Sequence, residues 1–127
     1  MTSLVASLTI DCRNPRAVAE FWNAALGYVV DDADDEGALI VDPTGRHWPI
    51  LFLVVPETKS TKNRLHVDLS PPTTMAAEVD RLVTVGAAVV RRVDEHGSYW
   101  TVMTDPEGNE FCVLRGPDDD PPKPRPA

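Results

Sequence analysis

One pattern of segments occurs twice along the chain. Gly27 to Val30 and Gly86 to Val90 each place a glycine before strand-forming residues, and the two glycines are 59 residues apart. Asp42 to Gly45 and Asp105 to Gly108 share the turn sequence Asp-Pro-x-Gly and are 63 residues apart. Repetition at a long, nearly constant offset is typical of a duplicated supersecondary unit. We therefore expect two copies of one unit, with the small difference in offset absorbed by turns.

The first copy is predicted to contain a strand, a helix and three further strands. Residues 4–10 alternate between apolar and mixed side chains, which is the period of two that a strand shows. Asn14 and Pro15 form a helix-start signal, and the apolar residues after them recur at helical spacing as far as Gly27. The further strands are expected at residues 28–30, 38–41 and 50–55, with turn sequences between them.

The second copy repeats this order after a polar linker. Residues 64–70 alternate like the first strand, and Pro72 with Thr73 or Thr74 opens a helix that Gly86 closes. The remaining strands are expected at residues 87–93, 99–104 and 110–115.

These units predict an α+β fold in which two βαβββ units form a curved, mixed sheet cup with helices on its outer face. We expect one domain over residues 1–116, with a first unit at 1–56 and a second at 63–116. The chain from 117 to 127 is rich in proline and aspartate, and we expect it to be disordered or extended.

The charge balance excludes some partners. Twenty acidic against twelve basic residues give a net charge of −8, which repels nucleic-acid phosphates and anionic lipid headgroups. We expect neither nucleic acid nor a membrane as a partner. With only two cysteines, no leader sequence before Leu4 and no apolar run of spanning length, we expect a reduced, cytoplasmic protein.

Three phrases of the sequence resemble the vicinal oxygen chelate superfamily, which contains glyoxalase I, extradiol dioxygenases and bleomycin-resistance proteins. They run from Asn14 to Tyr28, from Lys62 to Leu69 and from Thr104 to Val113, and the last two resemble the glyoxalase-like branch in particular. The resemblance covers nearly all of the chain up to Gly116. It implies the two-unit fold and a homodimer.

The resemblance also implies where a divalent metal would be held. Catalytic members use histidine or carboxylate side chains on the first and last strands of the units, and the matching positions here are Ser7, Phe52 or a neighbour, His66 and Cys112. Only His66 is a good ligand for a hard ion. We therefore expect no metal and no other cofactor.

Three roles for His66 remain open: a metal ligand, a polar residue of a binding pocket, or a purely structural hydrogen-bonding residue. A metal site could still form if Asp68, on the face of His66, and Glu110, on the face of Cys112, supplied further donors.

The aromatic side chains favour the prediction of a ligand pocket with aromatic walls. Trp48, Phe52 and Trp100 lie on or beside strands that would line the concave face, although the facing of Trp100 is undecided by strand parity. We predict no catalytic residue, because no nucleophile motif or phosphate-binding loop is present. The predicted ligand-binding residues are Ser7, Thr9, Trp48, Phe52, His66, Asp68, Trp100, Glu110 and Cys112.

Two functions follow as hypotheses. The first is a binding protein without metal that sequesters a small apolar or aromatic molecule, as the antibiotic-resistance members of the superfamily do. The second is a glyoxalase-like lyase, isomerase or dioxygenase that uses His66 as a metal ligand or general base.

Overall fold

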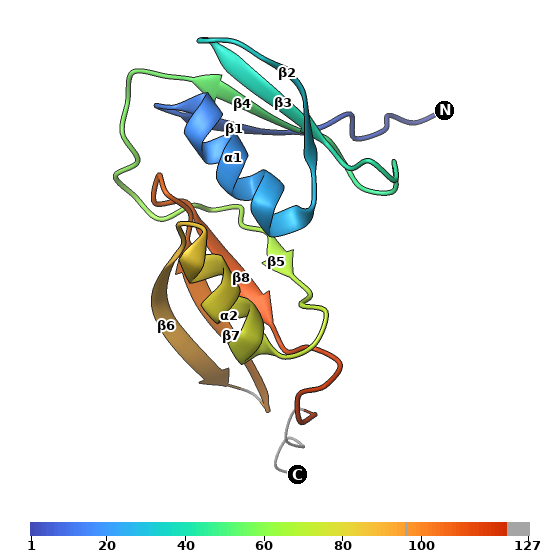
Figure 1. The fold of residues 1–127 in the computed structure, drawn as a ribbon, viewed down its shortest axis with the longest axis vertical. Helices are drawn as coiled ribbons and strands as arrows, with labels where there is room; N and C mark the ends of the chain where they lie inside the picture. The colour runs from blue at the N-terminus through green and yellow to red at the C-terminus, as the bar shows by residue number, and fades with distance from the viewer. Residues whose placement is uncertain (96, 122–127) are drawn as a thin grey trace. The chain divides into compact units, whose positions relative to one another are not determined.

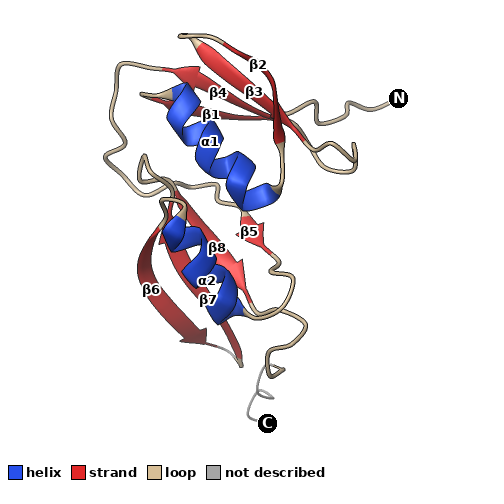
Figure 2. Ribbon diagram, viewed as in Figure 1, coloured by secondary structure: helices blue, strands red, loops and turns tan. Residues whose placement is uncertain are grey.

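The computed structural model describes residues 1–95 and 97–121, which belong to two compact units. Unit 1 is Met1–Ser60 and unit 2 is Thr61–Ala127. In each unit a single helix lies against a four-stranded mixed sheet (Figure 1 and Figure 2). The predicted α+β class and the two βαβββ units are confirmed. No helix in the described part of the chain has the length and hydropathy that a membrane crossing requires.

Unit 1 consists of β1 (Leu8–Cys12), α1 (Pro15–Leu26), β2 (Val29–Ala33), β3 (Gly37–Val41) and β4 (Ile50–Val54). Its strands lie in the order β1-β4-β3-β2, with β1 parallel to β4 and the other neighbours antiparallel. The first strand of the unit is therefore hydrogen-bonded to the last.

Helix α1 begins and ends where the sequence predicts. The side chain of Asn14 accepts a hydrogen bond from the backbone N–H of Ala17, Pro15 occupies the first turn, and Gly27 closes the helix with a φ of 71°. The apolar stripe of the helix packs on β3 and β4. The core of unit 1 that results is formed by Cys12, Val18, Ala19, Phe21, Trp22, Ala25, Ala38, Ile40, Ile50 and Phe52.

Unit 2 consists of β5 (Asp68–Leu69), α2 (Met75–Thr84), β6 (Ala88–Glu95), β7 (Ser98–Thr104) and β8 (Glu110–Leu114). The strand order β5-β8-β7-β6 repeats that of unit 1, including the parallel pairing of first and last strands. The side chain of Thr74 caps α2 by accepting from the N–H of Ala77. The core under α2 contains Met75, Leu82, Met103, Phe111 and Val113.

The repeated Asp-Pro-x-Gly turns are built alike. The Asp42 carboxylate accepts from the backbone N–H of Thr44, and the Asp105 carboxylate accepts from that of Glu107, at 2.8 and 2.9 Å. In each turn the glycine N–H donates to the carbonyl of the same aspartate. These side chains satisfy backbone groups that a hairpin turn leaves unpaired, which is why the motif recurs before the last strand of each unit.

Two predicted strands are shorter than expected. Strand β1 begins at Leu8 rather than Leu4, because its partner β4 begins at Ile50, the residue paired with Leu8. Leu4 is therefore exposed despite the alternating pattern. Strand β5 covers two residues instead of 64–70, and His66 lies just before it. Alternation marks residues suited to a strand, but only a pairing partner makes one.

The start of the tail, for which the sequence predicts a disordered or extended chain, makes hydrogen bonds at the beginning of α2. One oxygen of the Asp119 carboxylate accepts from the backbone N–H groups of both Met75 and Gly116, each at 2.7 Å. The N–H of Asp118 donates to the carbonyl of Thr73. Gly116 runs so close to that carbonyl that a Cβ atom would clash with it. The predicted disorder at residues 122–127 lies outside the described residues.

The Asp119 contact generates a prediction about pH. Its two backbone hydrogen bonds hold the pKa of the carboxyl below the ordinary value of 3.8. The stabilisation is therefore complete at neutral pH and is lost as the pH falls through this lowered pKa. We expect Asp119→Ala to lower the melting temperature at pH 7, and the difference from wild type to shrink in acid. Asp118→Ala is the matched control, because the contact of Asp118 with Thr73 uses its backbone. An equal effect of both variants at all pH values would contradict the assignment.

A second prediction concerns Phe52, which is fully buried under α1. Phe52→Ala removes a core ring, so we expect it to lower the free energy of unfolding by about 4 kcal/mol. Leu53→Ala, on the opposite face of the same strand, should cost much less. Urea denaturation measures both. A Phe52 variant of unchanged stability that lost ligand binding would place the ring in a pocket wall instead.

Candidate functional site

The sheet of unit 2 has one face covered by α2 and one face that α2 does not cover, which we call the open face. Thr101 lies on the covered face, since its hydroxyl donates to Sδ of Met75 in α2. Strand residues alternate between faces, so Trp100 and Val102 lie on the open one. Directly paired residues point the same way, and Val102 pairs with Cys112, which pairs in turn with Asp68. The open face therefore carries Trp100, whose facing the sequence leaves undecided, beside Asp68 and Cys112.

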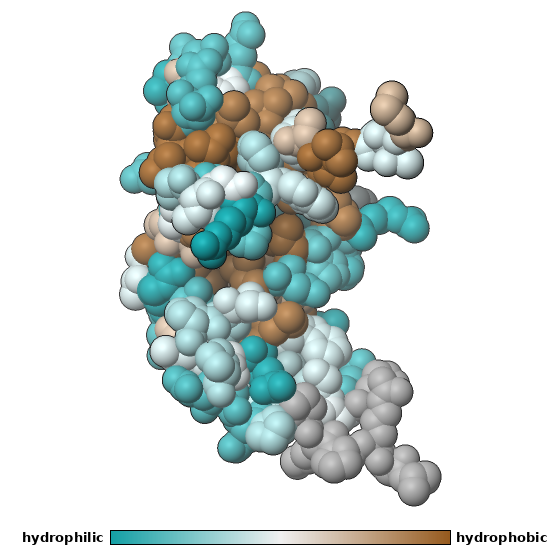
Figure 3. Space-filling view, turned by 90° about the vertical axis from the view of Figure 1, so that its right-hand side faces the viewer, coloured by the Kyte–Doolittle hydropathy of each residue, from teal (hydrophilic) through white to brown (hydrophobic). Residues whose placement is uncertain are grey.

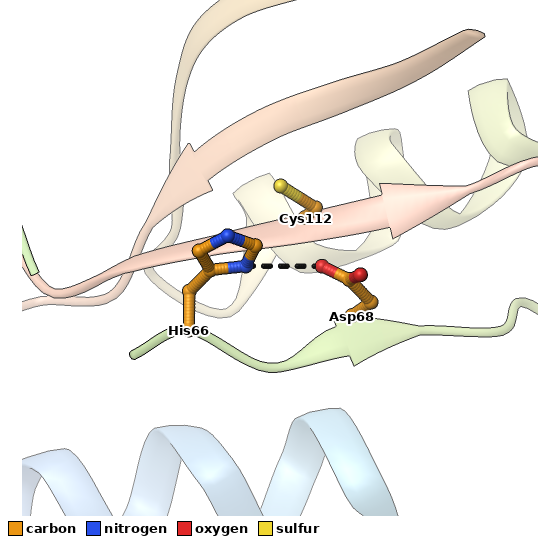
Figure 4. A group of neighbouring side chains, drawn as sticks. All are labelled: His66, Asp68 and Cys112. Carbon is orange, nitrogen blue, oxygen red and sulfur yellow. Dashed lines mark hydrogen bonds and ion pairs between the residues drawn. The ribbon is translucent and has the colours of Figure 1, made fainter. Parts of the chain in front are cut away.

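Three polar side chains meet on this face. One candidate ligand atom each from His66, Asp68 and Cys112 lies within 4.8 Å of the other two. Figure 4 shows the His66 imidazole on the segment that leads into β5, the Asp68 carboxylate on β5 itself and the Cys112 thiol on the neighbouring β8. His66 Nδ1 is 3.1 Å from Asp68 Oδ1. We call these three residues the unit 2 cluster.

The members of the unit 2 cluster differ in exposure. The side chains of His66 and Asp68 are 37% and 48% exposed, whereas Cys112 is buried. Burial and the charge and hydrogen bond of Asp68 raise the pKa of the Cys112 thiol, and the positive charges of Lys62 and Arg91 oppose this. The thiol therefore keeps its proton at neutral pH, which makes it a poor nucleophile.

His66 is oriented by Asp68. When Nδ1 donates to the carboxylate, Nε2 carries a lone pair and can accept a proton, accept a hydrogen bond or bind a metal. A carboxylate that holds an imidazole in one tautomer is the usual arrangement for a histidine that acts as base or ligand.

Glu110, another predicted site residue, has a structural contact. Its carboxylate accepts from the backbone N–H of Asn63 at 2.9 Å, and its own N–H donates to the Asn63 side chain at 3.2 Å. The same side chain donates to Asn109. Asn63 thus ties the segment before β5 to the start of β8. Sequence reasoning missed it, because a polar residue in a linker carries no periodic signal.

The four predicted residues of unit 1 do not form a matching cluster. Thr9 pairs with Leu51 on the face opposite Phe52, and Ser7 precedes β1. Phe52 lies in the core under α1. Neighbouring residues of a strand face opposite ways, so Leu51 lies on the face of Thr9 while Phe52, one position later, points into the core. Trp48 is exposed and precedes β4, and its carbonyl accepts from the hydroxyl of Tyr28.

A cavity of about 450 Å³ lies at the end of the unit 2 sheet where β5 and β8 both terminate. It begins two residues beyond Asp68 on one strand and two beyond Cys112 on the other. The residues that line it are Ser70, Pro71, Ser98, Tyr99, Leu114, Arg115, Gly116 and Pro117.

The donor atoms on this face do not suit a hard divalent ion. Such ions prefer carboxylate, carbonyl and water oxygen. The unit 2 cluster offers one carboxylate, one imidazole and one thiol. The positions of unit 1 that are equivalent in the repeat hold Ser7, Thr9 and Leu51, of which Leu51 has no donor atom. The ligand set that the resemblance implies is therefore not reproduced.

Solved structures with the same fold are numerous, and three illustrate their range. A glyoxalase-related enzyme from Fulvimarina pelagi is 17% identical, with 89% of this chain and 88% of that one covered and a TM-score of 0.70. The fosfomycin resistance protein FosX from Listeria monocytogenes, complexed with Mn(II) and 1S,2S-dihydroxypropylphosphonic acid, is 10% identical, with 91% and 92% covered and a TM-score of 0.72.

The third is the bleomycin-binding protein of Streptomyces verticillus, complexed with copper(II)-bleomycin. It is 14% identical, with 91% of this chain and 99% of that one covered and a TM-score of 0.61. At these identities the likeness shows a shared fold and no shared activity.

One curated protein also matches in sequence, the preterminal protein of Bovine adenovirus B serotype 3. It is 31% identical over an alignment of 115 positions, which covers 87% of this chain. The chain spans only 16% of the length of the viral protein.

A family model covers nearly the whole of both units. The model, described as a glyoxalase-like domain, matches residues 7–114. Its limits run from the residue before β1 to the last residue of β8, so they enclose the two βαβββ units and leave out the tail. The chain belongs to the glyoxalase-like domain family of the vicinal oxygen chelate superfamily.

Proposed function

We propose that the protein binds a small apolar or aromatic molecule against the open face of the unit 2 sheet. The observation that carries this proposal is the placement of half-buried Trp100 on the same face as the unit 2 cluster. An aromatic wall beside a few convergent polar groups is the usual composition of a small-molecule site.

The shape of this face supports the proposal. Trp100 and Leu114 are paired across β7 and β8, so they form one apolar surface. The cavity at the end of the sheet continues from Leu114. A planar ligand could stack on the indole while its polar edge meets His66 and Asp68. The bleomycin-binding protein, which has this fold, is complexed with copper(II)-bleomycin, so the fold can hold a small molecule.

We further propose that binding needs no hard divalent ion such as Mn²⁺ or Mg²⁺. The unit 2 cluster offers a thiol and only one carboxylate, whereas such ions prefer several oxygen donors.

The test is ligand titration followed by tryptophan fluorescence. With a panel of planar natural products and the dye anilinonaphthalene sulfonate, we expect quenching at micromolar concentration in metal-free buffer. Trp100→Phe should remove most of the quenching, and Trp48→Phe is the matched control that should keep it. Added Mn²⁺ should leave the affinity unchanged. Absence of quenching across the panel, or equal quenching in the Trp100 variant, would refute the proposal.

An enzyme is the second candidate, and the 3.1 Å contact between His66 and Asp68 favours it. An imidazole oriented in this way can act as a general base toward a ligand on the open face, with Asp68 stabilising the charged form. The reaction would be that of a lyase, isomerase or dioxygenase.

For this candidate, we expect His66→Ala to abolish turnover of any substrate on which the wild type acts, since the variant loses the proton acceptor while remaining folded. His47→Ala, which changes an exposed turn histidine, should keep full activity. Retained turnover in the His66 variant would exclude the imidazole as the base.

A homodimer in the cytoplasm completes the proposal. The edge strands β2 and β6 expose Val29, Val30, Val89 and Val90. Hydrophobic residues also reach the surface on the face that Figure 3 presents. Unpaired strand edges with apolar residues favour association with another chain. Both cysteines are free thiols, which suits a reducing compartment.

A further inference from the structure

The unit 2 cluster brings together an imidazole nitrogen and a carboxylate oxygen from residues 66 and 68 with a thiol sulfur from residue 112. The three ligand atoms lie within 4.8 Å of one another, and His66 Nδ1 and Asp68 Oδ1 are 3.1 Å apart. For Nδ1 to bind an ion, the imidazole must carry its proton on Nε2 instead of donating it from Nδ1 to Asp68. Ligand atoms about 2.0 to 2.3 Å from a tetrahedral ion are separated by roughly 3.3 to 3.7 Å. Side-chain rotations that move the ligand atoms by about an ångström would therefore bring all three into contact with one ion.

We propose that His66, Asp68 and Cys112 form a binding site for a thiophilic divalent ion of the zinc type, held by unit 2 alone. This departs from our sequence-based expectation of no metal. It also departs from the family pattern, because Asp68 takes part and unit 1 supplies no ligand.

The charges of the unit 2 cluster suit such an ion. The Asp68 carboxylate carries one negative charge, and the Cys112 thiol supplies a second when the ion displaces its proton to water. Two anionic ligands and a neutral imidazole neutralise a doubly charged ion.

The donor types select among ions. Thiolate sulfur favours Zn²⁺ and disfavours Mn²⁺ or Mg²⁺, for which oxygen is preferred. Zinc bound by three protein ligands normally keeps a fourth position for water or another molecule. Because His66 and Asp68 are partly exposed, this position can be reached from solvent.

The metal site can be tested separately from the proposed ligand binding, although both involve His66 and Asp68. The metal site requires only the unit 2 cluster, whereas the organic ligand is proposed to rest on Trp100. Cobalt titration without an organic ligand tests the first, and fluorescence titration in metal-free buffer tests the second, so either can fail alone.

The experiment is titration of the metal-free full chain with Co²⁺, followed by absorption. A cobalt ion bound to a thiolate produces a near-ultraviolet charge-transfer band that reports the sulfur ligand directly. We expect this band in the wild type and its loss in Cys112→Ser, which keeps the size of the side chain. Cys12→Ser is the matched control, since Cys12 is a buried cysteine of unit 1, and it should keep the band.

Further variants and ions test the other ligands and the selectivity. Asp68→Asn and His66→Gln should each weaken cobalt binding by about tenfold or more. Zn²⁺ should displace Co²⁺ and raise the melting temperature of the wild type but not of Cys112→Ser. The proposal is overturned if no band forms even in a large excess of cobalt, if the band survives in Cys112→Ser, or if Mn²⁺ displaces Co²⁺ as readily as Zn²⁺.

Discussion

The parallel pairing of β5 with β8 is the contact on which the candidate site depends. It joins the first strand of unit 2 to the last and places Asp68 directly beside Cys112. The pairing is short, and it is extended by the hydrogen bonds of Asn63 with Glu110 and Asn109. Parallel strands need a long crossover between them, and α2 with β6 and β7 supplies it. The chemistry of the site thus arises from the way each βαβββ unit closes on itself.

The two faces of the unit 2 sheet carry different kinds of side chain. The face toward α2 buries Met103, Phe111 and Val113 and provides the apolar core. The open face carries the ionisable groups and Trp100, where their polar atoms can meet solvent or a ligand. Cys112 shares features of both faces, because it is buried like the core residues but lies beside Asp68 on the open face. A helix on one side of each sheet makes this division possible.

Duplication has preserved the scaffold of the two units but not their side chains. Where unit 2 has His66, Asp68 and Cys112, the equivalent positions of unit 1 have Ser7, Thr9 and Leu51. The turn aspartates, by contrast, make the same backbone contacts in both units. Groups that hold the backbone recur because both units need them to fold.

The periodicity, caps and turn motifs in the sequence determined the two units, the helix limits at Asn14 and Gly27, and the class of the fold. These signals are local, so they can be read without knowing what a segment touches. The facing of Trp100, the burial of Phe52 and the anchoring of Asp119 were decided only by the tertiary structure. Each depends on which strand pairs with which residue, and a shift of one position moves a side chain from a core to an open face.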